Sequence, residues 1–420
     1  MIQLIKGFKD ILPEEVALWQ QIEKTAADIF EDFGFREIRI PMMERTELFA
    51  RSIGQDTDIV EKEMYTFADR KGDLLTLRPE ATASVVRAYI QHKLYTPDPV
   101  RKLYTIGPMF RRERPQKGRY RQFYQINAEV FGVASPYIDA QLIIMLAVLF
   151  ERLMIKDIKA HINSLGCPQC RPAFKKILGD FISSKIDRLC TDCRRRKDRN
   201  PLRVLDCKVP ACRQAMADAP ALTDHICEAC REHFNTVQEI LNTQGVEYIL
   251  DKGLVRGLDY YTRTTFEIQT SALGAQNAIA GGGRYDRLVH ALGGPEIPAI
   301  GFAIGLDRLV EVVLQQERSL GRGPDVFIAA LGEKSRQMAF DWSCDLNRDG
   351  ISTEMEFADK SLKSQMKRAH RLNSAHVLIV GENELAKGEI ILRNMNTKEQ
   401  HALTIEGLVK SVKDRIRGDL

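Results

Sequence analysis

Eight cysteines occur as four short pairs between residues 167 and 230, and metal binding is the chemistry that this spacing offers. The pairs read CPQC, CTDC, CKVPAC and CEAC. Each pair can give two thiolates to one tetrahedral zinc ion, so the segment could hold two sites of four cysteines each. The candidate ligands are Cys167, Cys170, Cys190, Cys193, Cys207, Cys212, Cys227 and Cys230.

The spacing leaves the pairing of these cysteines open, and His225 or His233 could replace one of them. Buried, unpaired thiols would be a poor explanation for four pairs in so short a segment. We expect structural zinc, up to two ions, because no open coordination position can be argued and a module this small would need the metal to fold. The ninth cysteine, Cys344, is expected only to pack.

Three arginines suggest a second kind of chemistry. Arg111, Arg256 and Arg308 each stand beside an expected strand or strand–helix junction, where a central sheet would normally hold apolar residues. Guanidinium groups match phosphate or carboxylate oxygens bidentately and stay charged at any working pH. One such arginine is usually a surface salt bridge, but three beside aromatic residues and glycines favour a phosphate-handling cleft.

Two carboxylates and a glycine run complete the candidate site. Glu80 and Glu129 could bind a cationic amine or a magnesium ion held on phosphates, although each alone would be a routine structural partner. Gly281, Gly282 and Gly283 are expected to form a tight turn, whose open backbone would also admit a flat ligand. The sequence AGGGRYD lacks the third glycine of a dinucleotide fingerprint.

The stretch FRRERPQKGRYRQF, residues 110–123, carries six basic side chains and one acid, Glu113. Residues 101–110 and 122–131 around it are rich in β-branched and aromatic residues, so we expect two antiparallel strands joined by a long basic loop. A solvated charged turn is the ordinary explanation for such a loop taken alone.

The other expected elements form an α+β domain. Apolar residues recur on one face of a helix over residues 11–33, followed by a strand ending at Pro41. The apolar run 142–150 is expected to be a buried helix, residues 253–270 another strand pair, and residues 298–315 a strand that runs into a helix. Few βαβ alternations occur, which indicates an antiparallel sheet.

The order of segments predicts three domains. The catalytic domain is expected over residues 1–165 and 234–318, interrupted by the cysteine-rich domain at 166–233. A linker at 319–324 precedes a small α/β domain at 325–420, in which Lys360, Lys363, Lys367, Arg368 and Arg371 have helical spacing. Such a basic face is most often simply solvated.

The net charge and the apolar content of the chain exclude few classes of function. The net charge is only +4, so a polyanionic partner has to be argued from where the charges lie. The start of the chain lacks the apolar core of a signal peptide, and the longest apolar run is far too short for a membrane span. We expect a cytoplasmic protein with no membrane partner.

Several motifs resemble one family. MFRRERPQKGRYRQF resembles motif 2 of the class II aminoacyl-tRNA synthetases, and GFAIGLDRL resembles their motif 3. LVRGLDYYTRTTFE and GGGRYDRL are similar to the two signatures that distinguish histidyl-tRNA synthetases within the class, and TLRPEATAS fits as well. The resemblance covers the whole chain except the cysteine-rich insertion, where the chain departs from the family pattern.

The resemblance implies a two-step reaction. ATP and histidine form histidyl-adenylate and pyrophosphate, and the histidyl group then passes to the 3′ end of tRNA(His). It implies that Arg111 contacts the α-phosphate and the histidine carboxylate, that Arg308 holds the γ-phosphate end of a bent ATP, and that Arg256 lies across the α-phosphate. Magnesium would bridge the outer phosphates.

The resemblance also implies the remaining site residues. Glu80, Thr82, Gln125 and Glu129 match positions around the histidine amino group and the ATP site, while Tyr261 and Tyr285 match those that receive the imidazole. The basic loop would neutralise phosphates at the tRNA acceptor end, through Arg112, Arg114, Lys117 and Arg119. The C-terminal domain resembles an anticodon-binding domain, and a homodimer is implied.

Two other classes of function compete with this interpretation. A regulatory subunit of ATP phosphoribosyltransferase would keep the fold as a binding module without charging tRNA, but such relatives typically lose the signatures around Arg256 and the C-terminal domain. A zinc-ribbon nucleic-acid binder would explain the insertion and leave the rest of the chain unexplained.

Overall fold

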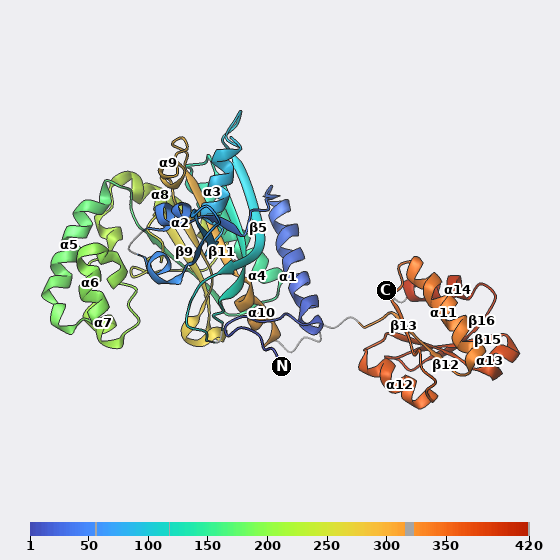
Figure 1. The fold of residues 1–420 in the computed structure, drawn as a ribbon. Helices are drawn as coiled ribbons and strands as arrows, with labels where there is room; N and C mark the ends of the chain where they lie inside the picture. The colour runs from blue at the N-terminus through green and yellow to red at the C-terminus, as the bar shows by residue number, and fades with distance from the viewer. Residues whose placement is uncertain (55–56, 117, 316–322, 419–420) are drawn as a thin grey trace. The chain divides into compact units, whose positions relative to one another are not determined.

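The computed structural model describes residues 1–54, 57–116, 118–315 and 323–418. Lys117 and most of the expected linker, 319–322, lie outside the described residues. The chain divides into two compact units, one containing most of the residues before 319 and the other most of those after it. Each unit is described by itself below (Figure 1).

An eight-stranded sheet is the centre of the first unit, in the order β1-β5-β6-β11-β10-β9-β7-β8. All neighbours from β5 to β7 run antiparallel, as the sequence predicted, whereas β1 and β8 join the two edges in parallel. The strands are β1 (Arg36–Glu37), β5 (Arg101–Phe110), β6 (Gln122–Phe131), β7 (Ile158–Ser164), β8 (Tyr248–Leu250), β9 (Thr262–Thr270), β10 (Ala278–Arg284) and β11 (Ala299–Gly305).

The expected helices are confirmed. Helix α1 (Pro13–Asp32) has proline and two glutamates in its first turn and buries a stripe that includes Leu18, Ile22 and Ile29. Helix α4 (Pro136–Arg152) is capped by the Ser135 hydroxyl and contains the predicted apolar run. Helices α3 (Thr82–Gln91) and α10 (Leu306–Leu314) start at the site described below, and α2 (Thr46–Ile53) and the short α9 (Leu288–Ala291) complete this part.

Two sequence predictions about this sheet are wrong. Only residues 262–270 of the expected strand pair at 253–270 form a strand, and the preceding segment is turn and loop, which places Arg256 off the sheet. The three glycines of AGGGRYD are not a turn but lie inside β10, paired with β9 and β11. The reason is tertiary, because side chains from other elements lie against these glycines.

The cysteine-rich insertion is helical and follows β7. It contains α5 (Cys170–Ser184), α6 (Thr191–Arg199), α7 (Pro210–Ala215) and the start of α8 (Glu228–Thr243). Figure 1 shows α5, α6 and α7 gathered beside the sheet on the side away from α1. Helix α8 continues past residue 233, where the insertion was expected to end, and packs on α4. No element boundary coincides with the expected end of the insertion, so the limits 166–233 stay a prediction.

The smaller sheet of the first unit consists of β2 (Met43–Arg45), β4 (Leu74–Leu77) and β3 (Tyr65–Ala68), all antiparallel. A π-helical turn, η1 (Ile59–Glu63), precedes β3. One face of this sheet is exposed and partly apolar, since Met43 is 48% and Phe67 44% exposed.

The second unit is a small α/β domain, as predicted. Its five strands have the order β13-β12-β14-β15-β16. The elements are β12 (Val326–Ala330), α11 (Glu333–Arg348), β13 (Thr353–Met355), α12 (Leu362–Arg371), β14 (His376–Val380), α13 (Glu382–Lys387), β15 (Glu389–Asn394), β16 (Gln400–Thr404) and α14 (Leu408–Gly418).

Helix α12 carries most of the predicted basic face, but Lys360 lies before the helix begins at Leu362. Lys363 and Lys367 are exposed, whereas Arg368 forms ion pairs with Glu354 and Glu356 at 3.3 and 3.1 Å. Among the helices of the described residues, none has the length and apolar character needed to cross a membrane.

Candidate active site

The three predicted arginines line one cavity of about 250 Å³. Arg111 follows β5 directly, Arg308 stands in the first turn of α10 after β11, and Arg256 comes from the loop before β9. Because β5, β6, β11, β10 and β9 are consecutive neighbours in the sheet, residues distant in sequence meet over the same surface. Arg119 and Gln125 line this cavity as well. The cavity has the concentration of guanidinium groups that phosphate oxygens require.

Each arginine is oriented by an acceptor at the cavity wall. Nε of Arg111 donates to the Pro79 carbonyl at 2.9 Å, and its guanidinium lies 5.2 Å from the Phe123 ring centre. Nη1 of Arg308 donates to the Ala278 carbonyl at 2.8 Å. Nη1 of Arg256 pairs with Glu267 at 2.8 Å. The guanidinium groups are therefore held in place before a ligand arrives.

The electrostatic character of the cavity is visible at Arg308. Burial lowers the pKa of its guanidinium, and the like charges of Arg119 and Arg111 lower it further, against the opposing effect of Glu113. Like charges gathered at one wall of a cavity create a positive potential. An anion bound there would relieve this repulsion.

Glycines within the strands make room for charged side chains on the sheet. A Cβ atom at Gly281 would collide with both terminal nitrogens of Arg256, and one at Gly301 would collide with Oε2 of Glu129. Each atom would lie far inside van der Waals contact, so no other residue fits without displacing the charged group. The absence of a side chain at Gly281 and Gly301 thus allows the guanidinium of Arg256 to lie against β10 and the carboxylate of Glu129 to lie against β11.

A buried acidic cluster adjoins the cavity. Glu129, in β6, accepts from the Thr82 hydroxyl at 2.6 Å and from the Tyr285 hydroxyl. Burial raises the pKa of Glu129 to about 8, and the two hydrogen bonds only partly oppose that rise. A buried carboxylate of this kind gains from a cationic partner, because the cation stabilises the charged form.

Glu80 belongs to the same cluster and has a structural role. Its two carboxylate oxygens accept from the backbone N–H groups of Thr82 and Ala83 at 2.7 and 2.9 Å, which satisfies unpaired donors at the start of α3. Burial raises its pKa, and these backbone hydrogen bonds oppose that shift. Helix capping fixes the position of Glu80 next to Glu129.

Aromatic rings enclose this cluster. The predicted Tyr261 and Tyr285 are buried. Tyr260, which the sequence analysis did not single out, is close to both, with its ring centre 4.6 Å from that of Tyr261 and 5.6 Å from that of Tyr285. Burial raises the pKa of each of the three phenols, so all three remain hydrogen-bond donors at neutral pH. The rings lie beside the arginine cavity, since the guanidinium of Arg256 stands 5.8 Å from the Tyr261 ring centre, but none of the three rings lines that cavity.

Two polar side chains on β6 connect the cavity to the acidic cluster. Gln125, Asn127 and Glu129 alternate along the strand and so share one face. The Oε1 atom of Gln125 and both amide atoms of Asn127 are buried and have no hydrogen-bond partner among the described residues. Buried polar atoms without partners usually await a ligand or water. Asn127 was missed by the sequence analysis, and alternation along the strand was the signal for it.

A buried ion-pair network lies behind Tyr285 and was also missed. Arg284 is fully buried and pairs with Asp139 at 2.8 Å and Asp286 at 3.0 Å. Nε2 of His233, on α8, lies 2.7 Å from the same Asp139. His233 is therefore part of this network and is not a ligand in either cysteine cluster, which contradicts one alternative from the sequence.

The basic loop between β5 and β6 is described except for Lys117, which lies outside the described residues. Arg112 and Arg114 are on the outer side of the loop, and the guanidinium of Arg112 stands 6.0 Å from the Tyr65 ring centre. Arg119 instead lines the arginine cavity and pairs with Glu113 at 3.3 Å. The loop thus has outward-facing cations and one that faces the cavity.

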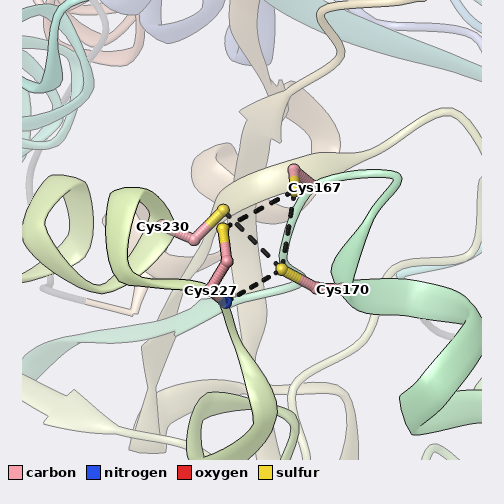
Figure 2. Close-up of side chains that lie close together, drawn as sticks. All are labelled: Cys167, Cys170, Cys227 and Cys230. Atoms are coloured by element: carbon pink, nitrogen blue, oxygen red, sulfur yellow. Dashed lines mark hydrogen bonds between the residues drawn. The ribbon is translucent and has the colours of Figure 1, made fainter.

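The eight paired cysteines form two clusters of four. Cys167 and Cys170 meet Cys227 and Cys230, and Cys190 and Cys193 meet Cys207 and Cys212, so the outer pairs share one cluster and the inner pairs the other. Figure 2 shows the side chains of the outer cluster pointing toward one another from the start of α5 and the start of α8. Each cluster consists of cysteines only, and histidine takes no part in either.

The sulfur spacing fits a metal and not disulfides. Sγ–Sγ distances in the outer cluster include 3.5, 3.8 and 4.0 Å, and one in the inner cluster is 3.9 Å. Four thiolates around a tetrahedral zinc at about 2.3 Å stand roughly 3.8 Å apart, whereas a disulfide needs about 2.05 Å. The backbone N–H groups of Cys227 and Cys190 donate to Sγ of Cys170 and Cys212 at 3.1 Å. Such bonds would stabilise thiolate ligands.

The antiparallel sheet, the arginines at its cavity and the separate C-terminal domain together define a class II aminoacyl-tRNA synthetase fold. Residues 7–309 match the family model described as histidyl-tRNA synthetase, and residues 325–415 match the anticodon binding domain. The chain belongs to the histidyl-tRNA synthetase family, the histidine–tRNA ligases. The resemblance seen in the motifs is thereby confirmed, but the exception made for the cysteine-rich insertion is wrong, because the match spans that segment as well.

Similar proteins support this placement over the full length. The chain is 64% identical over 407 residues to a histidine–tRNA ligase of Desulforapulum autotrophicum, covering 97% of this chain and 96% of that one. It is 65% identical to a histidine–tRNA ligase of Desulfosudis oleivorans, covering 96% of both. The crystal structure of apo S. aureus histidyl-tRNA synthetase superposes with a TM-score of 0.82 at 34% identity, covering 98% of this chain and 100% of that one.

The non-charging alternative has only structural likeness in its favour. An ATP phosphoribosyltransferase regulatory subunit/histidyl-tRNA synthetase from Bacillus halodurans C superposes with a TM-score of 0.65 at 19% identity, covering 91% of this chain and 98% of that one, which shows the fold alone. The zinc-ribbon alternative does not explain a family match that spans most of the chain.

Proposed function

We propose that this chain activates histidine with ATP, forming histidyl-adenylate and pyrophosphate, and then transfers the histidyl group to the 3′ end of tRNA(His). The observation that carries the proposal is the meeting of Arg111, Arg256 and Arg308 in one cavity beside a buried acidic cluster. An anion site next to a site for an ammonium group suits a nucleotide phosphate and an amino acid that react together.

ATP occupies the arginine cavity. Arg308 holds the γ-phosphate end, and Arg111 reaches the α-phosphate and the histidine carboxylate. Glu129, on the same face of β6 as Gln125, adds a polar contact to the ATP site. Glu113 and Glu267 line the same cavity and offer the oxygen ligands that magnesium prefers. Magnesium bound there would neutralise the charge of the outer phosphates.

Histidine occupies the pocket of acids and phenols. Its ammonium group meets Glu80 and Glu129, and Thr82 and Gln125 complete the polar wall. Tyr261 and Tyr285 receive the imidazole. A pocket built from buried hydrogen-bonding groups rejects ligands that leave those groups unpaired, and this discrimination would select histidine.

The activation step depends on position and charge. As the histidine carboxylate attacks, negative charge accumulates on the α-phosphate, and Arg111 and Arg256 stabilise it from two sides. No protein nucleophile is needed. The guanidinium groups are already held by Pro79 and Glu267, so little reorganisation accompanies the reaction.

Transfer requires the acceptor end of the tRNA over the same cavity. We assign its phosphates to the basic loop, with Arg112, Arg114, Lys117 and Arg119 as candidates, because neutralising phosphates supplies much of such affinity. The second unit would bind the anticodon, in keeping with its family match. The exposed Lys363 and Lys367 on α12 are candidates for phosphate contacts there.

Three further features belong to the proposal. Each cysteine cluster holds one structural zinc ion, whose thiolate ligands leave no open position for catalysis. The chain forms a homodimer, which the exposed apolar face of the β2-β4-β3 sheet supports. The protein works in the cytoplasm.

Amino-acid-dependent exchange of pyrophosphate into ATP tests the proposal. Purified chain should support exchange with histidine and not with the other standard amino acids, and it should charge tRNA(His). Arg256→Ala should lower the exchange rate by about two orders of magnitude, as loss of one transition-state donor does. Exchange that is absent, or equal for several amino acids, would refute the proposed activity.

A further inference from the structure

The insertion touches the loop that carries Arg256 and Tyr261 at three points. Nη1 of Arg203 donates to the Arg256 carbonyl at 3.3 Å, and Nδ2 of Asn200 donates to Oδ1 of Asp259 at 2.6 Å. Nη2 of Arg171 donates to the Tyr261 carbonyl. The loop 256–261 has no strand of its own, so these contacts fix a segment that the sheet does not hold.

The three contact residues are tied to the cysteine clusters. Arg171 directly follows Cys170 of the outer cluster. Asn200 and Arg203 lie on the segment between Cys193 and Cys207, which the inner cluster closes into a loop. Each cluster therefore positions a side chain that reaches one end of the loop 256–261.

A second route runs from the outer cluster to the imidazole pocket. Cys227 precedes helix α8 and Cys230 lies in its first turn. One turn further along, His233 pairs with Asp139, which in turn pairs with Arg284 beside Tyr285. Fixing the start of α8 thus also fixes the buried network behind the second tyrosine.

The insertion has little apart from metal to hold it. The apolar core of the insertion is small, and six of its fifteen buried members are the cysteines Cys167, Cys170, Cys193, Cys207, Cys212 and Cys230. Thiols packed at 3.5 to 4.0 Å without a metal give weak hydrogen bonds only. Metal–thiolate bonds supply the folding free energy that so small a core lacks.

We propose that the two four-cysteine clusters, each with a bound zinc ion, brace the loop 256–261 through Arg171, Asn200 and Arg203, and so hold Arg256 and Tyr261 in position for histidine activation. The inference rests on the proposed function. It makes Arg171, Asn200 and Arg203 positioning residues, acting through the loop and not on the substrate. Zinc in this family member would then control the geometry of the amino-acid site as well as the fold of the insertion.

The first test removes the hydrogen bond of Arg203 to the loop, together with its 3.9 Å ion pair with Asp58, and leaves the cysteines in place. Arg203→Ala in the full chain should raise the KM for histidine in pyrophosphate exchange roughly fivefold, the loss typical of one hydrogen bond, and should change the KM for ATP less than twofold or so. Arg203→Lys, which keeps a donor, should recover most of the loss. Exchange is measured without tRNA, so a direct contact of Arg203 with tRNA would not contribute.

Arg213→Ala is the matched control, because Arg213 is an exposed arginine on α7 of the same insertion. It should leave both KM values unchanged. Zinc content, measured by mass spectrometry of the metal, should equal that of the wild type in all three variants. If Arg203→Ala and Arg213→Ala gave the same histidine KM, the brace would be refuted.

The second test removes the metal from the full-length wild-type protein. Zinc should copurify at about two ions per chain, and chelation should raise the histidine KM about tenfold or more, with recovery on adding Zn²⁺ and not Mg²⁺. Fewer than about one zinc per chain with all thiols reduced, or a zinc-free protein with an unchanged histidine KM, would overturn the proposal. Wild-type exchange is measured first, so failure of the activity itself would be seen separately.

Discussion

At the scale of single residues, the site combines permanent cations with carboxylates of raised pKa. The sequence predicted the arginines, the tyrosines and both glutamates through the motifs that carry them. It did not predict Asn127 or Tyr260, because their importance depends on which face of a strand or loop they share with the other candidate site residues. It also did not predict that Glu80 caps a helix, because that requires the loop before α3 to be in place.

The first prediction concerns the protonation of Glu129 when histidine binds. Its pKa is about 8 in the unliganded site because of burial, so it is largely protonated at pH 7, and a bound ammonium group would favour its ionised form. Histidine binding should therefore release a proton, and affinity should rise between about pH 6 and 8. Calorimetry in buffers of different ionisation enthalpy measures that release.

Glu129→Gln is the control for this titration. The imidazole of histidine titrates in both proteins, so only the difference between them reports Glu129. The variant should bind histidine at least about tenfold more weakly, because a charged hydrogen bond is lost, and should release fewer protons. Equal proton release by both proteins would show that Glu129 does not meet the ammonium group.

The second prediction concerns two arginines of the basic loop and the reaction step that each one affects. Arg114 lies outside the arginine cavity, so Arg114→Ala should slow transfer to tRNA and leave adenylate formation unchanged. Arg119 lines the arginine cavity, so Arg119→Ala should slow adenylate formation as well. In the sequence analysis Arg119 is assigned to the acceptor end of the tRNA, and that assignment alone predicts that Arg119→Ala slows transfer more than activation. Single-turnover rates of the two steps separate these effects, and selective slowing of activation by Arg114→Ala would contradict the assignment.

At the scale of elements, the hairpin β5–β6, the helices α1 and α4 and the step from β11 into α10 were all predictable from alternation and periodicity. The glycine strand β10 was not. Three consecutive glycines have the composition of a turn, and only the neighbours β9 and β11 and the side chains over them explain a strand there. The pairing of the cysteines likewise depends on how the insertion folds and not on spacing.

The glycines of β10 provide a matched pair of substitutions. In Gly281→Ala the new methyl group would meet the movable guanidinium of Arg256, so activation should fall about a hundredfold while stability changes little. In Gly282→Ala it would collide with the Gly301 carbonyl in the neighbouring strand, so the sheet itself must shift. That variant should lose several kcal/mol of unfolding free energy, by analogy with overpacked cores.

Denaturant unfolding and pyrophosphate exchange, measured on both variants, separate the two effects. The account predicts a folded, poorly active Gly281→Ala and an unstable Gly282→Ala. If Gly281→Ala retained full activity, the position of Arg256 against β10 would not be needed for activation.

At the scale of the whole molecule, the exposed face of the β2-β4-β3 sheet presents apolar side chains, including Met43 and Phe67, to solvent in the single chain. Phe67→Glu on that face should weaken the proposed dimer by about 2 kcal/mol, as loss of a central aromatic contact does, without unfolding the chain. Sedimentation equilibrium measures the shift toward the 47.7 kDa monomer. Ile177→Glu, on the exposed side of α5 in the insertion, is the control. A wild-type chain that sediments as a monomer would refute the dimer.

The central claim is that guanidinium groups from three distant parts of the chain meet around one nucleotide phosphate. A crystal structure with a hydrolysis-resistant histidyl-adenylate analogue tests it most directly. The account predicts Arg111 and Arg256 within hydrogen-bonding distance of the group that replaces the α-phosphate, with the imidazole between Tyr261 and Tyr285. An analogue bound elsewhere, or with its phosphate position out of reach of both arginines, would contradict the account.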